Sequence, residues 1–600
     1  MHLRPSIIWA FLAGTLLVPA FAPYGLWPLA ILSPAFLLHL WHQAPHARHS
    51  FALGLSYGLG LFGCGVSWVF VSIHDYGHSN KPTAILITTL FVSVLALFIA
   101  CQGYVLKRYF KGPVISHALL GFPSTWVLFE WLRSVLFSGF PWLYLGYAGL
   151  DTPLQGYAPL ASVYAVSTSM AFSSGLCYLL YTRAAMKIRL HCLFLGCLAW
   201  GLGAWLHTQI WVHDISAHPR YPTQTLRQPQ STHQDPLASQ DHRPHRYTVS
   251  LVQGNIKPLD KFVQADPIAS TERIYGTLSQ AHWGADLILW PEGAIPLSVS
   301  ATGLDTVSHR PTTAIPAEVP ESSLNGSCPL RHPVFAQQKS GTPPTGSPVS
   351  QLLNPPSGMA EASTCNEATS GEANAYLKIL DQRAAAHHAT LIAGIQSINA
   401  QGEYYNSLIA LGQGHGIYHK VHLVPFGDFL PFDAWLRGLT DFFNLPMSSF
   451  SAGPEQQPLL EAHTLHNPLN TLLINPLICY EIAFPEQVRR TLRNAAVIVT
   501  LSEDGWFGNS LGPPQHLQIA RMRALETGRY VLRVTTSGLT AIINAQGQVI
   551  SSIPPFKAGV LSGHFEALAG QTPWVRWGLW PLLTILLLGF LGPGRLKSRS

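Results

Sequence analysis

Long apolar stretches separated by short polar segments occupy the first third of the chain. Each is long enough, or nearly so, to cross a hydrocarbon core, which requires about 20 helical residues. The pattern predicts membrane-spanning helices near residues 6–22, 25–41, 51–74, 83–106, 114–135, 157–181 and 190–212. One more predicted span runs from Trp574 to Leu591 and is followed by a basic tail, which makes eight spans in all and places both termini on the same side.

The first apolar stretch has a second interpretation. Arg4 precedes an apolar run that ends in Val18-Pro19-Ala20, a pattern that is also compatible with a cleaved signal peptide. The next apolar run follows almost at once, which favours a retained membrane helix.

From about residue 213 to 572 the pattern changes to short apolar strands that alternate with helical periodicity. Predicted strands are 248–253, 286–290, 390–394, 472–479 and 496–502, and predicted helices are 270–282 and 515–528. This alternation is typical of an α/β or layered α/β/α domain. The predicted organisation is N-terminal membrane helices (1–212), a linker (213–246), a globular domain (247–572) and a C-terminal helix with its tail (573–600).

One part of the globular region lacks periodicity. Residues from about 300 to 372 are rich in Pro, Ser, Thr and Gly, which predicts a disordered or loosely packed insertion. Cys328 and Cys365 both lie in it. In an oxidising compartment these two cysteines could pair, and two unpaired thiols are equally compatible with the sequence.

Composition excludes an ordinary soluble protein. Of 600 residues, 48% are hydrophobic and 11% charged, whereas soluble domains carry about 25% charged residues. The net charge of +6 is modest and the basic residues are scattered or lie beside apolar runs, which argues against nucleic acid as a partner. Arg48, the segments 107–111 and 183–189, and the basic tail fall on one face of the predicted membrane, which the positive-inside rule makes cytoplasmic. The globular domain is therefore predicted to lie outside the cytoplasm.

Three reactive side chains follow apolar strands of the globular domain: Glu292, Lys420 and Cys479. Each alone has an ordinary explanation, as a turn residue, a solvated charge and an inert core thiol. Together they suit acyl transfer, because a carboxylate can act as general base and a neighbouring ammonium lowers the pKa of a thiol. Lys420 lies among apolar residues and needs a carboxylate partner, for which Asp428 is a candidate. The eight cysteines show no spacing suited to zinc, and no cofactor is indicated.

The motifs around these residues resemble the Glu-Lys-Cys triad of the nitrilase superfamily. They are Trp-Pro-Glu ending at Glu292, His-Lys-Val-His-Leu-Val-Pro-Phe-Gly around Lys420, and Ile-Cys-Tyr-Glu around Cys479. With the membrane spans and Asp-Gly-Trp-Phe-Gly at 504–508, the chain resembles the apolipoprotein N-acyltransferases. The resemblance implies a multi-span helical bundle joined to an αββα sandwich, placed in the periplasm at a bacterial inner membrane.

The resemblance also implies the reaction. An acyl chain moves from a phospholipid, typically phosphatidylethanolamine, through a cysteine thioester to the N-terminal amine of a diacylglyceryl-cysteine in an apolipoprotein. Glu292 is then the general base, Lys420 stabilises the oxyanion and Cys479 carries the thioester. The implied supporting or substrate-binding residues are Asp428, Tyr480, Glu481, Trp506 and Phe262. Nothing in the sequence demands more than one copy, so a monomer is expected.

Two alternatives remain at this point. A membrane-tethered amidase would use the same three residues with water in place of the amine. A non-enzymatic membrane scaffold or transporter would need none of them. The chain also departs from the family pattern at three positions, with Asp428 in place of the usual glutamate, Phe262 in place of tryptophan and Glu503 in place of asparagine. These departures leave the three reactive residues intact and bear on substrate positioning.

Overall fold

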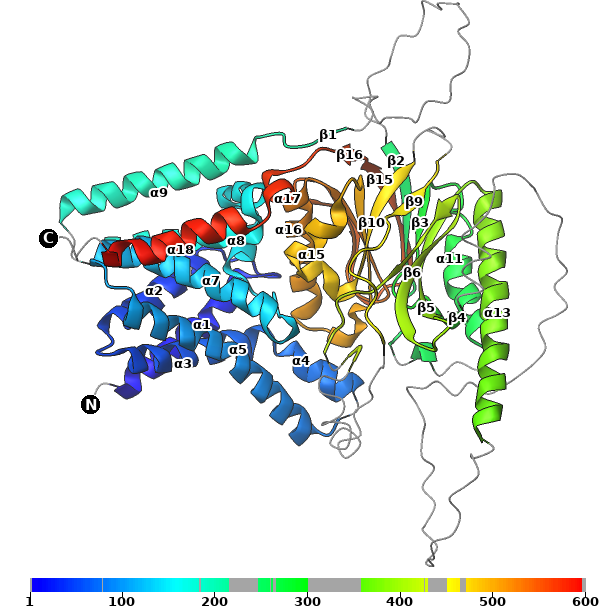
Figure 1. The fold of residues 1–600 in the computed structure, drawn as a ribbon, viewed down its shortest axis with the longest axis horizontal. Coiled ribbons are helices and arrows are strands. Elements are labelled where there is room, and N and C mark those ends of the chain that lie inside the picture. The colour runs from blue at the N-terminus through cyan, green and yellow to red at the C-terminus, as the bar shows by residue number, and fades with distance from the viewer. Residues whose placement is uncertain are drawn as a thin grey trace, which may run out of the picture.

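The computed structural model describes residues 3–77, 79–182, 185–214, 246–258, 260–262, 266–300, 358–425, 427–429, 450–464 and 471–595. A helical bundle and a pair of stacked sheets lie side by side along the long axis of the molecule (Figure 1). The N-terminal end of α1 and the C-terminal end of α18 both lie on the helical side, far from the sheets (Figure 1).

Helices are present in each of the eight segments predicted to span a membrane. They are α1 (Leu3–Leu17), α2 (Leu29–Gln43), α3 (Ala47–Gly65) with α4 (Trp68–Val71), α5 (Lys81–Tyr109), α7 (Phe122–Val135), α8 (Ala158–Tyr181), α9 (Met186–His207) and α18 (Trp580–Arg595). By length and composition, three helices of the described chain can cross a membrane, or four if the pair bent by 53° after Gly65 is one span. The number of eight spans therefore stays a prediction.

The bundle has the surface and packing of a membrane domain. Large apolar side chains on α5 and α9, such as Leu90 (58% exposed) and Phe194 (66% exposed), face outward, where water would make them costly. Small residues let helices approach closely, as expected where lipid supplies no hydrophobic drive. A Cβ at Gly54 of α3 would lie 2.5 Å from the Ile99 carbonyl oxygen of α5, so only glycine allows this contact.

Two seven-stranded sheets form the centre of the globular domain. In order, the first contains β14 (Val549–Ile553), β13 (Thr540–Ile543), β12 (Tyr530–Thr535), β11 (Val497–Ser502), β10 (Leu472–Ile478), β9 (Leu460–Ala462) and β7 (Gly414–His415). The second contains β15 (Gly559–Glu566), β2 (Arg246–Gln253), β3 (Leu287–Leu289), β5 (Thr390–Ile398), β6 (Tyr404–Gly412) and β8 (Ile417–His419), with β4 (Ile295–Ser300) beside β5.

Apolar side chains from the facing sides of both sheets form one core, among them Leu251, Leu289 and Ile392 of the second sheet and Ile474 and Val499 of the first. Helices α15 (Pro485–Leu492) and α16 (Gly512–Thr527) cover the first sheet on the side of the bundle, and α13 (Gly358–Ala386) covers the second on the outside (Figure 1). The layers are α, β, β, α, which confirms the predicted sandwich.

Parallel pairing brings the carboxyl ends of the central strands together. β10 pairs in parallel with β11, with Ile478 opposite Leu501, and β3 pairs in parallel with β5, with Leu289 opposite Ile392. Residues that follow these strands therefore gather at common sheet edges.

The globular domain is docked on the bundle through α16. The side-chain oxygen of Gln515 accepts hydrogen bonds from the indole nitrogens of Trp142 (2.7 Å) and Trp68 (3.3 Å). At the other end of the helix, buried Glu526 accepts from Ser162 Oγ and the Val163 main-chain nitrogen, both at 2.7 Å. Fixed, buried contacts of this kind hold the sheet edges at one level relative to the membrane helices.

The structure changes two sequence-based boundaries. The predicted insertion extends too far, because its last part, from Gly358, belongs to α13, where alanine and glutamate favour a helix. The last predicted span is interrupted: α17 (Pro573–Trp577) ends at Gly578, whose φ is 68°, and α18 begins at Trp580. Residues 301–357, with Cys328, and residues 215–245 of the linker lie outside the described part, as does the side chain of Cys365.

Candidate active site

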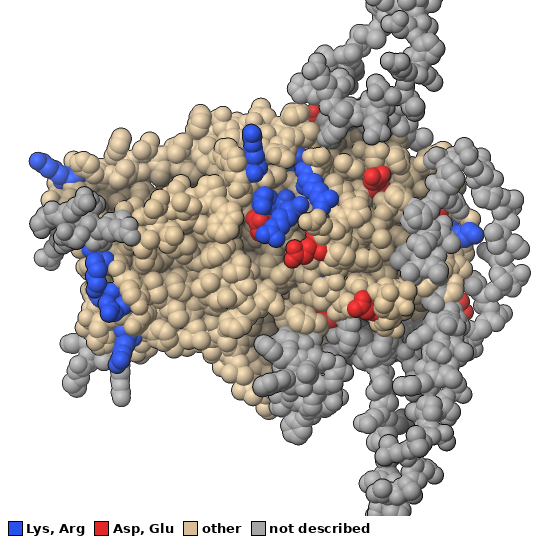
Figure 2. Space-filling view, viewed as in Figure 1, with Lys and Arg blue, Asp and Glu red and all other residues tan. Residues whose placement is uncertain are grey.

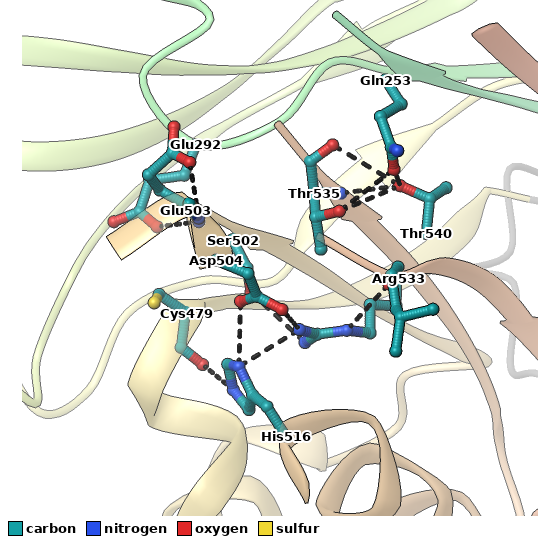
Figure 3. Close-up of polar contacts among 12 residues, drawn as sticks. Gln253, Glu292, Cys479, Ser502, Glu503, Asp504, His516, Arg533, Thr535 and Thr540 are labelled. Atoms are coloured by element: carbon teal, nitrogen blue, oxygen red, sulfur yellow. Dashed lines mark hydrogen bonds and ion pairs between the residues drawn. The ribbon is translucent and has the colours of Figure 1, made fainter. Parts of the chain in front are cut away.

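Cys479 directly follows β10 with a φ of 52°. A left-handed backbone is uncommon outside glycine and persists only where neighbouring groups hold it. The carbonyl oxygen of Cys479 lies 3.2 Å from Nε2 of His516 in α16. His516 in turn contacts Asp504 and Arg533, each at 3.1 Å, and all three side chains are buried (Figure 3). The turn that presents the thiol is thus fixed from beneath by a polar cluster.

Glu292 comes two residues after Trp290, beyond the end of β3, in the other sheet. Its Oε1 accepts a hydrogen bond from Asn406 Nδ2 (2.7 Å), and its Oε2 accepts one from the main-chain nitrogen of Glu503 (2.8 Å; Figure 3). Both carboxylate oxygens are therefore held, and the charge of this carboxylate acts on the Cys479 thiol.

Lys420 follows β8 and is almost completely buried, with 1% of its side chain exposed. Its Nζ lies 2.7 Å from Asp428 Oδ2 and 3.6 Å from Glu292 Oε1. Burial alone would lower the pKa of Lys420, but Asp428, Glu292 and Cys479 together raise it above its ordinary value. The ammonium is therefore a permanent positive charge, and Asp428 reaches it although it is one methylene shorter than the glutamate expected from the resemblance.

The structure corrects the expectation that the pKa of the Cys479 thiol is lowered. Burial and the negative charge of Glu292 raise its pKa well above the ordinary value, although Lys420 acts in the opposite direction. A lowered pKa was expected from the neighbouring ammonium, because the sequence alone does not show the desolvation or how close the Glu292 carboxylate lies. At neutral pH the group is a protonated thiol, so a base is needed to generate the nucleophile.

Glu481 connects the segment that carries Lys420 with the segment that carries Cys479. Its carboxylate accepts hydrogen bonds from the Ile478 nitrogen (2.7 Å) and the Tyr418 hydroxyl (2.9 Å). Further bonds come from the main-chain nitrogens of Val421 and His422 and from Gln487 Nε2, at 2.7–3.1 Å. Burial raises the pKa of Glu481, and these hydrogen bonds oppose that rise. The side chain is a fixed internal anchor with no free oxygen for substrate.

Two other residues expected at the site face the membrane helices. The hydroxyl of Tyr480 donates to the Gly139 carbonyl (3.1 Å). The carbonyl of Trp506 accepts from Ser72 Oγ (2.8 Å), and its ring lies 5.8 Å from that of Tyr76. The side chain of Phe262 lies outside the described part of the chain, where only its backbone is placed.

Several residues that hold the site were not predicted from the sequence. Asn406 and Ser407 are polar residues in β6, whose other residues are aromatic, aliphatic or glycine, and this is a usable signal. His516 and Lys261 gave no local signal, because their importance depends on contacts between distant segments. Within the described ranges, no three His, Cys, Asp or Glu side chains are placed to hold a metal ion.

Comparisons with known proteins agree with this architecture. Residues 13–176 match the family model of the apolipoprotein N-acyltransferase N-terminal domain, and residues 248–573 match that of carbon-nitrogen hydrolase. The apolipoprotein N-acyltransferase of Coxiella burnetii is 35% identical over 97% of this chain and 99% of its own, and that of Azotobacter vinelandii is 33% identical over 98% and 94%. Among solved structures, a carbon-nitrogen hydrolase from Helicobacter pylori is 14% identical, covering 59% of this chain and 97% of its own, with a TM-score of 0.31.

The sandwich, its matched family model and the apolar bundle define a membrane protein whose globular domain has the nitrilase-type, carbon-nitrogen hydrolase fold. It is an enzyme of that superfamily. More narrowly, the chain belongs to the apolipoprotein N-acyltransferase family, which it matches over nearly its whole length.

Proposed function

We propose that this enzyme transfers an acyl chain from a phospholipid to the N-terminal amine of the diacylglyceryl-cysteine of apolipoproteins, with Cys479, Glu292 and Lys420 as catalytic residues. The convergence of a fixed carboxylate and a buried ammonium on one thiol carries the proposal. Family membership supports acyl transfer over the membrane-tethered amidase.

In the first half-reaction, Glu292 takes the proton of the Cys479 thiol and the sulfur attacks the ester carbonyl of the phospholipid. Lys420 stabilises the oxyanion, a contribution of about 3–4 kcal/mol for such a donor. The carbonyl reforms as the carbon–oxygen bond breaks, and the lysophospholipid leaves with the proton from Glu292. In the second, the lipoprotein amine attacks the thioester, Glu292 accepts a proton, and the thiol is regenerated beside a new amide.

We also propose that the globular domain lies in the periplasm and the bundle in the inner membrane of a bacterium. On the face shown in Figure 2, Lys and Arg side chains gather at the end of the bundle far from the sheets and again at its junction with them, with a stretch free of charge between. That spacing supports a membrane between the two belts, with the far end cytoplasmic. Phosphatidylethanolamine is the proposed donor, and one copy of the chain is the proposed active unit.

The test uses the full chain in detergent with phosphatidylethanolamine and a synthetic diacylated lipopeptide. Mass spectrometry should find a third acyl chain on the lipopeptide amine, and an acyl mass on Cys479 when the lipopeptide is omitted. Cys479→Ala should abolish both, whereas Cys64→Ala, at another partly buried cysteine, should leave them unchanged. Release of free fatty acid without lipopeptide acylation would instead indicate a hydrolase.

A further inference from the structure

An ion pair that the catalytic scheme does not use lies directly beside Glu292. Lys261 Nζ contacts Glu503 Oε2, and only 4% and 7% of the two side chains are exposed. Burying two charges is costly unless they are paired and hydrogen-bonded. Lys261 Nζ also donates to Thr536 Oγ1 (3.0 Å), and Glu503 Oε1 accepts from the Gly505 nitrogen (3.0 Å).

Both members of the pair also hold Glu292. The Lys261 ammonium donates to the main-chain carbonyl of Glu292 (3.0 Å), and the main-chain nitrogen of Glu503 donates to Glu292 Oε2 (2.8 Å; Figure 3). Hydrogen bonds from two segments therefore hold Glu292. The turn after β2 binds its backbone, and the residue after β11 binds its carboxylate. Glu503 is also one of the departures from the family pattern, and Lys261 supplies its counter-charge.

We propose that Lys261 is a positioning residue for the reaction, which holds Glu292 in place and, by neutralising Glu503, sets the charge that Glu292 experiences. The inference rests on the proposed role of Glu292 as general base. Among the residues that the structure describes, the other charged or titratable groups close to Glu292 are Lys420, with its partner Asp428, and Cys479.

The two single variants should have opposite electrostatic effects. Lys261→Met leaves Glu503 without a counter-ion beside Glu292, so the acidic limb of the pH profile should move to higher pH. Glu503→Gln leaves the Lys261 charge uncompensated, so that limb should move to lower pH. A nearby like charge disfavours the ionised form of a carboxyl, and a nearby opposite charge favours it. The double variant is neutral again, and its limb should return close to that of the native enzyme.

The experiment measures the rate of acyl-enzyme formation on Cys479 as a function of pH, in the full chain with phosphatidylethanolamine in detergent micelles. Lys261→Arg, which keeps the charge, should retain the native limb. Lys261→Met should acylate about tenfold or more slowly at neutral pH, because the carbonyl of Glu292 loses its donor. The double variant buries no unpaired charge and is the comparison if a single variant is too unstable to purify.

A purely structural role predicts slower acylation with the acidic limb unmoved, and that result would overturn the inference. Limbs that move in the same direction in both single variants would also overturn it. Failure of the native enzyme to acylate Cys479 at all would contradict the proposed function instead, so the two failures are distinguishable.

Discussion

His516 lies beneath Cys479, with its Nε2 3.2 Å from the Cys479 carbonyl oxygen. Burial and the charge of Arg533 lower the pKa of His516, although Asp504 opposes them. Nε2 donates to this carbonyl, while Nδ1 lies 3.1 Å from both Asp504 Oδ1 and Arg533 Nη2. The contact stabilises the left-handed turn in which Cys479 presents its sulfur.

Replacing His516 should impair acylation without touching a reacting atom. His516→Leu removes the donor and leaves the Cys479 carbonyl unpaired, a loss of about 1–3 kcal/mol in the free energy of unfolding. We expect about 10–100-fold slower acyl-enzyme formation, because a small displacement of a nucleophile strongly reduces the reaction rate. His516→Gln, whose amide can still donate to that carbonyl, should recover part of the rate. Intact-protein mass spectrometry measures both, and a native rate in His516→Leu would rule out this role.

Two substitutions should change the alkylation rate of the Cys479 thiol in opposite directions. Because Glu292 contributes to the raised pKa of Cys479, Glu292→Gln should increase the thiolate fraction and speed alkylation of Cys479 by iodoacetamide at pH 7, while acyl transfer is lost. Lys420→Met should slow alkylation, because a charge that lowers the pKa is gone. Peptide mass spectrometry distinguishes alkylation of Cys479 from alkylation of the other cysteines. Slower alkylation in Glu292→Gln would show that the two groups do not interact as described.

Local sequence signals predicted the strands well, because each is an apolar run that ends in a polar turn. β10 and β11 match the predicted segments to within one residue at either end, and Cys479 follows β10 as expected for a residue at the edge of a sheet. The αββα arrangement and the pairing of Lys420 with a carboxylate also agree with the sequence-based expectation.

Other features of the site could not be predicted from the sequence, because they depend on burial and on contacts between distant segments. The direction of the Cys479 pKa shift depends on desolvation, which has no signature in a single motif. Lys261 and Glu503 are 242 positions apart, and nothing in their local sequence indicates that the fold buries them together as a pair. The break at Gly578 depends on a left-handed φ that an apolar run conceals.

A stability prediction follows from His422, whose Nε2 donates to the Ser138 carbonyl (2.7 Å) at the junction with the bundle. Burial, opposed by Ser138 and aided by Lys420, lowers its pKa from 6.5 to about 4. Between these values the unfolded chain binds more protons than the folded one, so the folded state loses stability as the pH falls from 6.5 towards 4.

The native enzyme should therefore unfold at a lower temperature at pH 4.5 than at pH 7, and His422→Gln should reduce that difference. Gln keeps a donor for Ser138 but does not titrate. After a discount for partial exposure, the effect on the free energy of unfolding is on the order of 1–2 kcal/mol. Thermal unfolding in detergent at the two pH values measures it. An equal pH effect in the variant would assign the loss to other groups.

The segment beside the site contains an exposed aromatic in a left-handed conformation. Phe137 has a φ of 55° and is 78% exposed, next to Leu136, which is 41% exposed. The carbonyls of the two following residues are held by the neighbours of the catalytic groups: that of Ser138 by His422 and that of Gly139 by Tyr480. The backbone that carries this exposed ring is therefore attached to the segments that follow Lys420 and Cys479, and we expect the ring to contact an acyl chain that approaches them.

Phe137→Ala should reduce acylation of Cys479 by long-chain phosphatidylethanolamine about 5–150-fold through a higher KM, because burying a phenyl ring against an acyl chain contributes on the order of 1–3 kcal/mol. Acylation by a short-chain, water-soluble ester should be unchanged, since that donor does not reach the ring. Phe194→Ala is the matched control, because Phe194 is also exposed (66%) but lies on α9 of the bundle. Equal losses for both donors, or an equal loss in the control, would show that the ring supports the fold or the membrane contact in general and does not bind the acyl chain.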